Sequence, residues 1–156
     1  MTNSSELYNA FYRKIEKDYQ FFSYYNLTDE EAVELAQSRA KGLLHDAVAE
    51  FKLNSLDIDI QLDEENEVIT PDLTNVEIDI LASIMFKIYL SRDVATLKSM
   101  INIMSSSDLK MLYAPANERK TFMDMYAKVQ SDLEEKIQKY IARDRLTGKR
   151  KTLEYE

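Results

Sequence analysis

The chain has 156 residues, of which 45 % are apolar, a formal net charge of -8 and no cysteine. This length fits one domain with a hydrophobic core of its own. The lack of cysteine excludes disulfide scaffolds and thiolate metal sites, and the acidic balance argues against a protein that neutralises nucleic-acid phosphates over its whole surface.

The amino-terminal segment and the longest apolar run predict neither export nor a membrane span. The segment "MTNSSELYNAFYRKIEKDY" is polar and lacks the charged-then-apolar order of a signal peptide. The run "ILASIMFKIYL" is interrupted by Lys87 and has about half the length that a bilayer requires. We therefore expect no membrane partner.

Two amphipathic helices are predicted in the first third of the chain. The first covers residues 5–24, because apolar residues recur at three- and four-residue spacing on one face: Leu7, Phe11, Ile15, Tyr19 and Phe22. Thr28 and Glu31 form a capping box that opens the second helix. The apolar stripe of this helix comprises Ala32, Leu35, Ala36, Ala40, Leu43, Ala47 and Phe51.

The period then changes to two, which indicates extended structure. Apolar residues at positions 56, 58, 60 and 62 alternate with Asp57, Asp59, Gln61 and Asp63. The polar stretch "DEENE" can turn this strand or arm back onto residues 68 and 69, and Pro71 closes the segment. Because a lone hairpin is only marginally stable, we expect it to pack on helices or on a partner.

A second capping box, formed by Thr74 and Glu77, predicts a third helix over residues 75–90. This helix is apolar on most sides, and its polar residues form one narrow stripe: Asp79, Ser83, Lys87 and Ser91. Such a helix is normally surrounded, either by the other helices of the chain or also by a neighbouring subunit. A shorter fourth helix is predicted over residues 93–104.

A long fifth helix is predicted after Pro115, which pushes Ala114 out of the helical region and suits the first turn of a new helix, with Asn117 as an alternative cap. It runs for roughly 28 residues, or about 42 Å, with near-heptad apolar positions. Beyond it, "RDRLTGKRKTLEYE" loses this periodicity and contains Gly148, which predicts a protruding tail.

These elements predict a mainly α protein: a bundle of about five helices with a long carboxy-terminal helix. Residues 1–142 form a single helical domain with an extended or β-hairpin arm inserted at 55–70, and residues 143–156 form an extended tail. Charge is uneven along this chain, since residues 46–79 carry eleven acids and one lysine, a net of -10, which leaves +2 for the remainder. Residues 143–151 carry five cations and one acid, a net of +4. The arm and the tail are thus oppositely charged.

Few residues indicate catalysis or metal binding. His45, the sole histidine, lies in the second helix just off the apolar stripe, and we interpret it as an exposed or boundary residue. No second histidine is present for a zinc site. The segment "DIDIQLDEENEV" matches a calcium loop at Asp57 and Asp59, but Leu62 replaces the turn glycine and Val68 replaces the bidentate glutamate.

Nucleotide binding and paired-carboxylate chemistry are also not indicated. Gly42 falls within a helix and Gly148 within the tail, so no glycine-rich loop is present to hold a phosphate. First-turn acids are favoured by the helix dipole without any catalytic role: Asp29, Glu30, Glu31 and Glu34. We interpret the seven methionines as core-filling residues rather than a partner groove. We therefore expect no enzyme and no cofactor.

Three segments together resemble small helical proteins of tailed bacteriophages, the head-tail connector or neck adaptor proteins. They are "TDEEAVELAQSRAKGLLHDAV", "DLTNVEIDILASIMFKIYL" and "SSSDLKMLYAPANERKTFMDMYAKVQSDLEEKIQKYI". The resemblance covers residues 26–141, and its most specific element is the "YAPAN" break before the long helix. The acidic arm at residues 55–70 is not matched to the general connector pattern.

The resemblance implies a structural virion protein that forms a homo-oligomeric ring, a dodecamer, beneath the portal. Its partners would be the portal protein and the next neck or tail protein, at the head-tail junction of particles assembled in the host cytoplasm. It implies no catalytic residues and no sequence-specific nucleic-acid binding, although the genome passes through such a ring.

From the charges we expect the tail to contact acidic surface on a neighbouring subunit or on the portal. The candidate interface residues are Asp57, Asp59, Asp63, Glu64, Glu65, Glu67, Arg143, Arg145, Lys149, Arg150 and Lys151. A second use for the acidic arm is the lining of a channel through which DNA passes without sticking. The alternative function is a non-enzymatic acidic helical regulator that binds a host protein or mimics nucleic-acid charge.

Overall fold

A computed structural model describes residues 1–15, 28–54, 58–103 and 116–152 of the chain. The described part is mainly helical with one small antiparallel sheet. Its helices are α1 (Ser4–Ile15), α3 (Asp29–Leu53), α4 (Asn75–Ile103) and α6 (Ala116–Ile141), and its strands are β1 (Thr2–Asn3), β2 (Gln61–Asp63) and β3 (Val68–Thr70).

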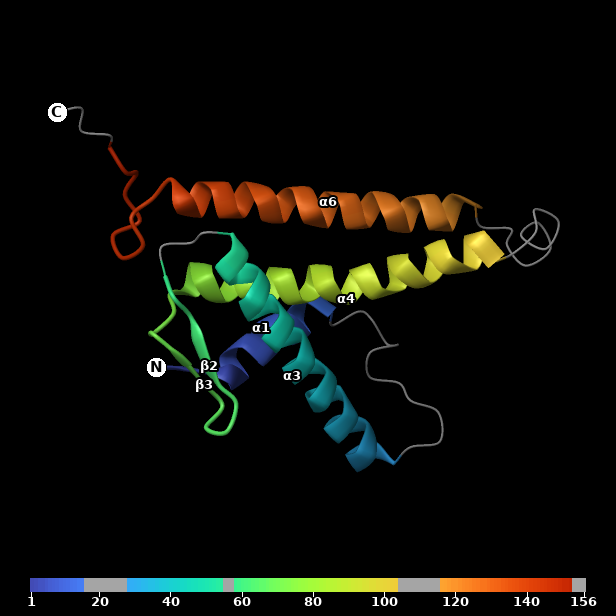
Figure 1. The fold of residues 1–156 in the computed structure, drawn as a ribbon, viewed down its shortest axis with the longest axis horizontal. Coiled ribbons are helices and arrows are strands. Elements are labelled where there is room, and N and C mark those ends of the chain that lie inside the picture. The colour runs from blue at the N-terminus through green and yellow to red at the C-terminus, as the bar shows by residue number, and fades with distance from the viewer. Residues whose placement is uncertain (16–27, 55–57, 104–115, 153–156) are drawn as a thin grey trace.

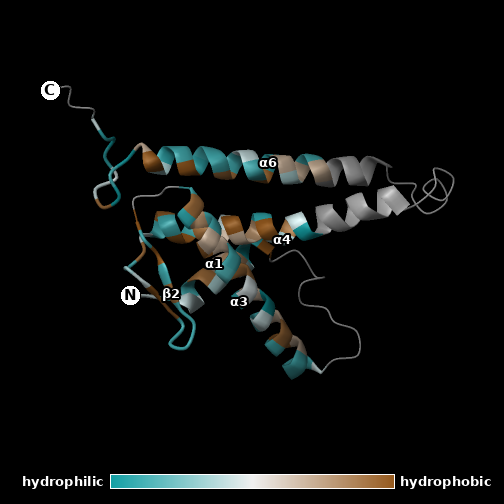
Figure 2. Cartoon of the chain, in the orientation of Figure 1, coloured by the Kyte–Doolittle hydropathy of each residue, from teal (hydrophilic) through white to brown (hydrophobic). Residues whose placement is uncertain are grey.

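Helix α4 is the centre of the arrangement (Figure 1). Helices α1 and α3 pack on it from one side, and α6 runs antiparallel beside it on the other. The brown, apolar part of α4 lies where these helices meet, whereas the turn between β2 and β3 is hydrophilic (Figure 2). In the described part, no helix is both long and apolar enough to cross a bilayer.

Helix α1 begins after Asn3, whose side-chain Oδ1 accepts a hydrogen bond from the backbone N of Ser5 at 2.8 Å. The predicted apolar face is confirmed at three positions, because Leu7, Phe11 and Ile15 are fully buried. The predicted continuation to residue 24, with its two aromatic residues at 19 and 22, lies outside the described residues.

The capping box of α3 is confirmed. The Thr28 hydroxyl accepts from the backbone N of Glu31, and the Glu31 carboxylate accepts from the backbone N of Thr28. The predicted stripe is buried from Ala36 to Phe51 but wrong at Leu35, which is 39 % exposed. The first turns of α3 extend past α4 in Figure 1, so apolar residues there are not covered by it.

The predicted third and fourth helices are one helix, α4. Residues 91 and 92, between the two predicted helices, are neither glycine nor proline, so nothing there interrupts the backbone hydrogen bonds. The described residues therefore hold four helices rather than the predicted five. The capping box at its start is confirmed, since Thr74 N donates to the Glu77 carboxylate at 2.7 Å and Glu77 N donates to the Thr74 hydroxyl at 3.4 Å.

Helices α1, α3 and α6 of the same chain cover the part of α4 whose side chains the structure describes. Its residues 80–85 are all buried, which is more than one full turn of the helix. Two residues of the predicted polar stripe form ion pairs with the neighbouring helices. Asp79 accepts from Lys14 of α1 at 2.7 Å and from Lys136 of α6 at 2.6 Å, and Lys87 pairs with Glu50 of α3.

The predicted hairpin is confirmed as β2 and β3, with Leu62 opposite Ile69. A strand that the sequence did not predict, β1, pairs with the other edge of β3, so that the order in the sheet is β1-β3-β2. Ile60 and Ile69 are fully buried and attach the sheet to the helices.

Helix α6 begins at Ala116, as expected for a helix that follows Pro115, and buries Leu133 and Ile137 against α4. The protruding tail predicted for residues 143–156 is not confirmed. Residues 142–151 instead fold into a short hairpin closed by an antiparallel bridge between Arg143 and Arg150. Residues 153–156 lie outside the described part.

Candidate interaction surfaces

The turn between β2 and β3 displays most of the predicted acidic interface. We call Asp59, Asp63, Glu64, Glu65 and Glu67 the acidic hairpin; Asp57 lies outside the described residues. The carboxylate of Asp63 organises the turn, because it accepts from the Asn66 side chain at 2.7 Å and from the backbone N of Asn66 and Glu65 at 3.1 Å. These bonds, chiefly those from Asn66, hold the pKa of Asp63 below its usual value.

The remaining carboxylates of the acidic hairpin differ in their partners. Glu67 forms an ion pair with Lys41 of α3 at 2.5 Å, and Asp59 forms a longer one with Lys52 at 3.7 Å. Glu64 and Glu65 are exposed at the tip of the turn and have no ion pair within the described part of the chain. The acidic hairpin therefore keeps uncompensated negative charge at its tip.

The opposite charge gathers on the hairpin of residues 142–151, which we call the basic hairpin. Asp144 builds its turn by accepting from the backbone N of Thr147 at 2.8 Å and of Leu146 at 3.2 Å, and Gly148 N donates to the Asp144 carbonyl at 2.9 Å. Four of its cations are exposed: Arg143, Lys149, Arg150 and Lys151.

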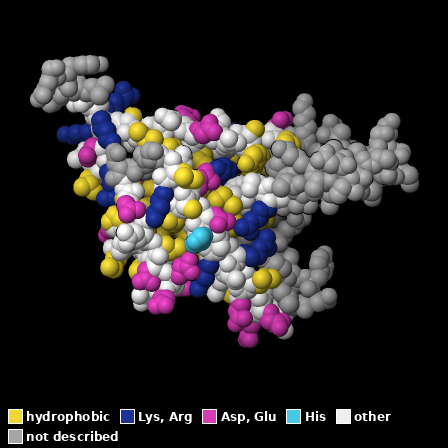
Figure 3. Space-filling view, viewed as in Figure 1, with side chains coloured by type: hydrophobic (Ala, Val, Ile, Leu, Met, Phe, Trp, Pro, Cys, Tyr) yellow, Lys and Arg dark blue, Asp and Glu magenta, His cyan; other side chains and the backbone are white. Residues whose placement is uncertain are grey.

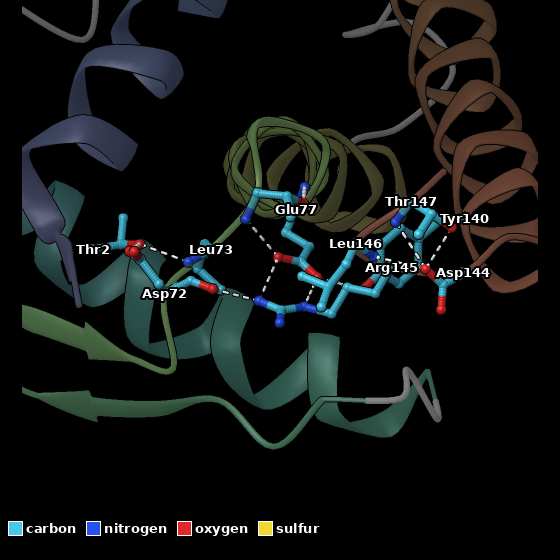
Figure 4. Close-up of polar contacts among 10 residues, drawn as sticks. Thr2, Asp72, Leu73, Glu77, Tyr140, Asp144, Arg145, Leu146 and Thr147 are labelled. Carbon is cyan, nitrogen blue, oxygen red and sulfur yellow. Dashed lines mark hydrogen bonds and ion pairs between the residues drawn. The ribbon is translucent and has the colours of Figure 1, made fainter. Parts of the chain in front are cut away.

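The fifth cation, Arg145, does not belong to this exposed surface. Its side chain turns inward and reaches the start of α4, where Nε donates to Glu77 at 2.5 Å and Nη2 donates to the same carboxylate and to the Asp72 carbonyl (Figure 4). The Glu77 side chain is 0 % exposed. Arg145 therefore differs from the four exposed cations of the predicted interface, because it anchors the basic hairpin to its own chain.

The Glu77 carboxylate has several donors around it. Besides Arg145, the hydroxyl of Tyr140 in α6 donates to it, as does the backbone N of Thr74. Burial alone would raise the pKa of Glu77, but the hydrogen bonds from Arg145, Tyr140 and Thr74 outweigh it and hold the pKa below the usual value. Burial and the bond to Glu77 raise the pKa of Tyr140. One ionised carboxylate thus joins α4, α6 and the basic hairpin.

The amino terminus meets the same region. The Thr2 hydroxyl donates to the Asp72 carboxylate at 3.0 Å and accepts from Leu73 N at 2.7 Å (Figure 4). The terminal ammonium lies 3.3 Å from the Asp72 carboxylate. The Thr2 hydroxyl, followed by the terminal ammonium, lowers the pKa of Asp72. Sequence analysis gave Glu77 only a capping role; an acid between Val76 and Ile78 at the start of an apolar helix was the signal that it needs a buried partner.

The acidic and basic hairpins do not meet within one copy of the chain. They lie on opposite sides of the amino-terminal end of α4 in Figure 1, and the space-filling view shows Asp and Glu side chains gathered on the first side and Lys and Arg side chains on the second (Figure 3). Any contact between them requires two copies.

The predicted exposed position of His45 is confirmed. Its side chain is 67 % exposed, and Nδ1 lies 3.6 Å from the Asp46 carboxylate. Among the residues that the structure describes, no group of three or more histidine, cysteine, aspartate or glutamate side chains has the arrangement of a metal site.

Comparison of the chain with protein-family models, with curated proteins and with solved structures found no match in any of the three.

Proposed function

We propose that the chain is a structural protein of tailed-bacteriophage particles: a non-enzymatic head-tail connector that forms a ring beneath the portal. In this role it binds the portal protein on one side and the next neck or tail protein on the other. Its place is the head-tail junction of the virion, and its assembly takes place in the host cytoplasm.

The observation that carries this proposal is the separation of two oppositely charged hairpins on one chain. The acidic hairpin and the basic hairpin lie on opposite sides of α4, so a pairing between them joins different patches of neighbouring copies (Figure 1). Such a heterologous contact generates a ring when the rotation that it imposes closes. Opposite charge in the two patches favours one register of neighbours over others.

The long pair of antiparallel helices, α4 and α6, supplies a further surface for partners. Helix α6 packs on α4 along one side. The core-filling role predicted for the methionines holds for the buried Met85 of α4 but not for Met123 and Met125 on α6, which are 36 % and 42 % exposed. Exposed methionines adapt to partners of varied shape, so we assign the portal or neck contact to this helix.

The test measures mass by light scattering, for the purified protein alone and after mixing with purified virion heads that lack tails. Specific uptake by these heads, at saturable stoichiometry, is the expected result. Complete virions serve as the control, because their junction is already occupied and should take up no protein. A chain that is ignored by tailless heads contradicts the proposal.

The alternative is a non-enzymatic regulator that binds a host protein through the acidic hairpin. The observation in its favour is the exposed pair Glu64 and Glu65 at the tip of that hairpin. Co-purification with one host protein that is lost on Glu64→Lys, Glu65→Lys substitution, together with no uptake by heads, would replace the connector with this function.

A further inference from the structure

A pocket of about 440 Å³ lies between α1, α3 and the acidic hairpin. Ser4 and Tyr8 of α1 line one side, Gly42 of α3 lines another, and Leu62 and Glu64 of the hairpin border it. Helix, helix and hairpin therefore form a concave surface directly beside the uncompensated acids of the hairpin tip.

The Ser4 hydroxyl is the first sign that this pocket has an occupant. Ser4 is 1 % exposed, and no described residue donates a hydrogen bond to its Oγ, which acts only as a donor toward Tyr8. Its backbone is fixed, because Ser4 N donates to the Glu67 carbonyl at 2.8 Å. Buried polar groups normally have partners. A donor that enters the pocket would fill the acceptor position of Ser4 Oγ.

Gly42 is the second sign. Glycine is unfavourable in the interior of a helix, and Gly42 is a mid-helix residue of α3. A Cβ at this position would have no neighbour within 4 Å, so packing inside the chain does not require glycine there. Close approach of another chain to the helix backbone would require it.

The charges around the pocket select a cationic occupant. Glu67 is paired with Lys41, and Asp46 lies 3.6 Å from Arg92. Glu64 and the adjacent Glu65 have no such ion pair in the described part of the chain, so the net charge at the rim of the pocket is negative. Burial raises the pKa of Tyr8 to about 12, the charges of Glu67, Tyr12 and Glu64 add to this effect in that order, and a hydrogen bond from Ser4 opposes it.

The basic hairpin has the matching chemistry. Lys149, Arg150 and Lys151 are exposed on it, and Leu146 at its turn is 79 % exposed, an unusual position for a large apolar side chain on a turn. Cations complement Glu64 and Glu65, and Leu146 can cover the half-buried Leu62 of the pocket.

We infer that the pocket receives the basic hairpin of a second copy of the chain, with a cationic side chain donating to the Ser4 hydroxyl and pairing with Glu64. This inference rests on the proposed function, because it names the contact by which one subunit of the ring holds the next. The hairpin that enters the pocket is kept in shape by Arg145 and Glu77 of its own subunit.

A charge-swap experiment tests the pairing. The hairpin-reversed variant carries three substitutions in the basic hairpin: Lys149→Glu, Arg150→Glu and Lys151→Glu. The pocket-reversed variant carries Glu64→Lys and Glu65→Lys. We expect the wild-type chain to self-associate in a salt-sensitive manner in sedimentation velocity, and each variant alone to associate about tenfold more weakly or less, because reversal places like charges together. An equimolar mixture of the two variants should recover association.

The matched control for the pocket-reversed variant is Asp124→Lys with Glu134→Lys, two exposed acids on α6 that change the net charge equally. This control should associate as the wild type does. A wild-type chain that stays monomeric up to millimolar concentration overturns the inference, as does a mixture of reversed variants that associates no better than either one.

Gly42→Leu tests the pocket without changing charge. A Cβ at position 42 meets no atom within 4 Å, so the helix should fold normally by circular dichroism, whereas the rest of the leucine side chain should occupy the pocket and abolish self-association. Gln37→Leu, an exposed position elsewhere on α3, is the control that should leave association intact. Ser4→Ala should fold as the wild type and weaken association several-fold. Full association of Gly42→Leu is incompatible with the inferred contact.

Failure of this inference can be told apart from failure of the proposed function. If tailless heads take up the wild type and both reversed variants equally, the chain is a connector whose subunits meet through another surface. If heads ignore the wild type while the charge-swap mixture still recovers association, the contact is real but serves a different assembly.

Discussion

The two hairpins of this protein are attached to the helical core in different ways. The acidic hairpin continues a sheet, with β1 hydrogen-bonded to its inner strand and Ile69 fully buried. In the basic hairpin, every residue from 142 to 151 is exposed except Arg145, which is half-buried against Glu77. One hairpin is thus positioned by backbone pairing and apolar burial, and the other by an ion pair with a buried carboxylate.

This difference decides how each hairpin can be broken. Apolar burial and a backbone ladder spread the stabilisation over several residues and do not depend on pH. An ion pair with a buried partner places most of the stabilisation in two residues, because removal of one member leaves the other charge buried and unpaired. If the basic hairpin enters a neighbouring subunit, its placement then depends on one residue pair inside its own subunit.

The largest effect is expected from Arg145→Met. Loss of the guanidinium leaves the fully buried Glu77 carboxylate without its charged partner, which should lower the free energy of unfolding by about 4 kcal/mol. Urea denaturation measures this change, and amide exchange should show lost protection in residues 142–151. The control is Arg143→Met, an exposed neighbour that should cost less than about 0.5 kcal/mol. Equal effects of the two substitutions would show that Arg145 is not an anchor.

A somewhat smaller effect is expected from Ile69→Ala in β3. The substitution leaves a cavity under the acidic hairpin and should cost about 3 kcal/mol of unfolding free energy, the middle of the range for buried isoleucine. The cost should be the same at pH 7 and pH 4.5, because no charge is involved. The neighbouring Val68→Ala, at a half-buried position, should cost less and so calibrate the measurement. A cost for Ile69→Ala no larger than that for Val68→Ala would contradict burial as the attachment.

The pH dependence of Glu77 sharpens the comparison further. Its pKa in the folded chain lies below the unperturbed 4.5, since its hydrogen bonds outweigh the effect of burial. The stabilisation from its ionised form is therefore complete above about pH 4.5 and is lost as the pH falls through the folded-state pKa. Unfolding free energies of wild type and Glu77→Gln, measured from pH 7 to pH 3, should converge as the pH falls.

Other acids with lowered pKa values, such as Asp79 beside Lys136 and Lys14, also destabilise the wild type in acid. They are present in both proteins, so the difference between wild type and Glu77→Gln isolates the one carboxylate. A difference that stays constant from pH 7 to pH 3 would mean that Glu77 acts through packing rather than charge.

The parts of the fold that sequence predicted are those set by local chemistry. Two capping boxes, at Thr28 and Thr74, gave the starts of α3 and α4, and strict alternation gave the hairpin of β2 and β3. The predicted break between the third and fourth helices is wrong, because residues 91 and 92 include neither glycine nor proline and α4 continues through them.

The parts that sequence missed depend on contacts between distant segments. Strand β1 has only two residues and exists because β3, more than sixty residues later, offers a free edge. Arg145 and Glu77 are separated by 68 residues, and neither has a neighbour in sequence that indicates the other. The sequence therefore predicted the acidic and basic segments of the candidate site. It did not predict that one of the cations, Arg145, pairs with a buried carboxylate of its own chain.

The smallest effects are expected at the two glycines, and they should have opposite signs. Gly42 lies in a helix with open space around its Cβ position, so Gly42→Ala should stabilise the chain by about 0.8–1 kcal/mol. Gly148, in the basic hairpin, has a φ of +67°, so Gly148→Ala should destabilise by about 1–2 kcal/mol. Urea denaturation of both variants gives the two signs in one series.

The sign of the stability change in Gly42→Ala tests whether Gly42 serves the pocket or its own helix. If alanine stabilises the isolated chain, the glycine is retained at a cost to the monomer, which agrees with close approach by a second copy at that position. If alanine destabilises it, the glycine serves its own helix, and the pocket loses one of the two features that indicate an occupant. The basic hairpin should be insensitive to this change, because its anchor residues Arg145 and Glu77 do not line the pocket that contains Gly42.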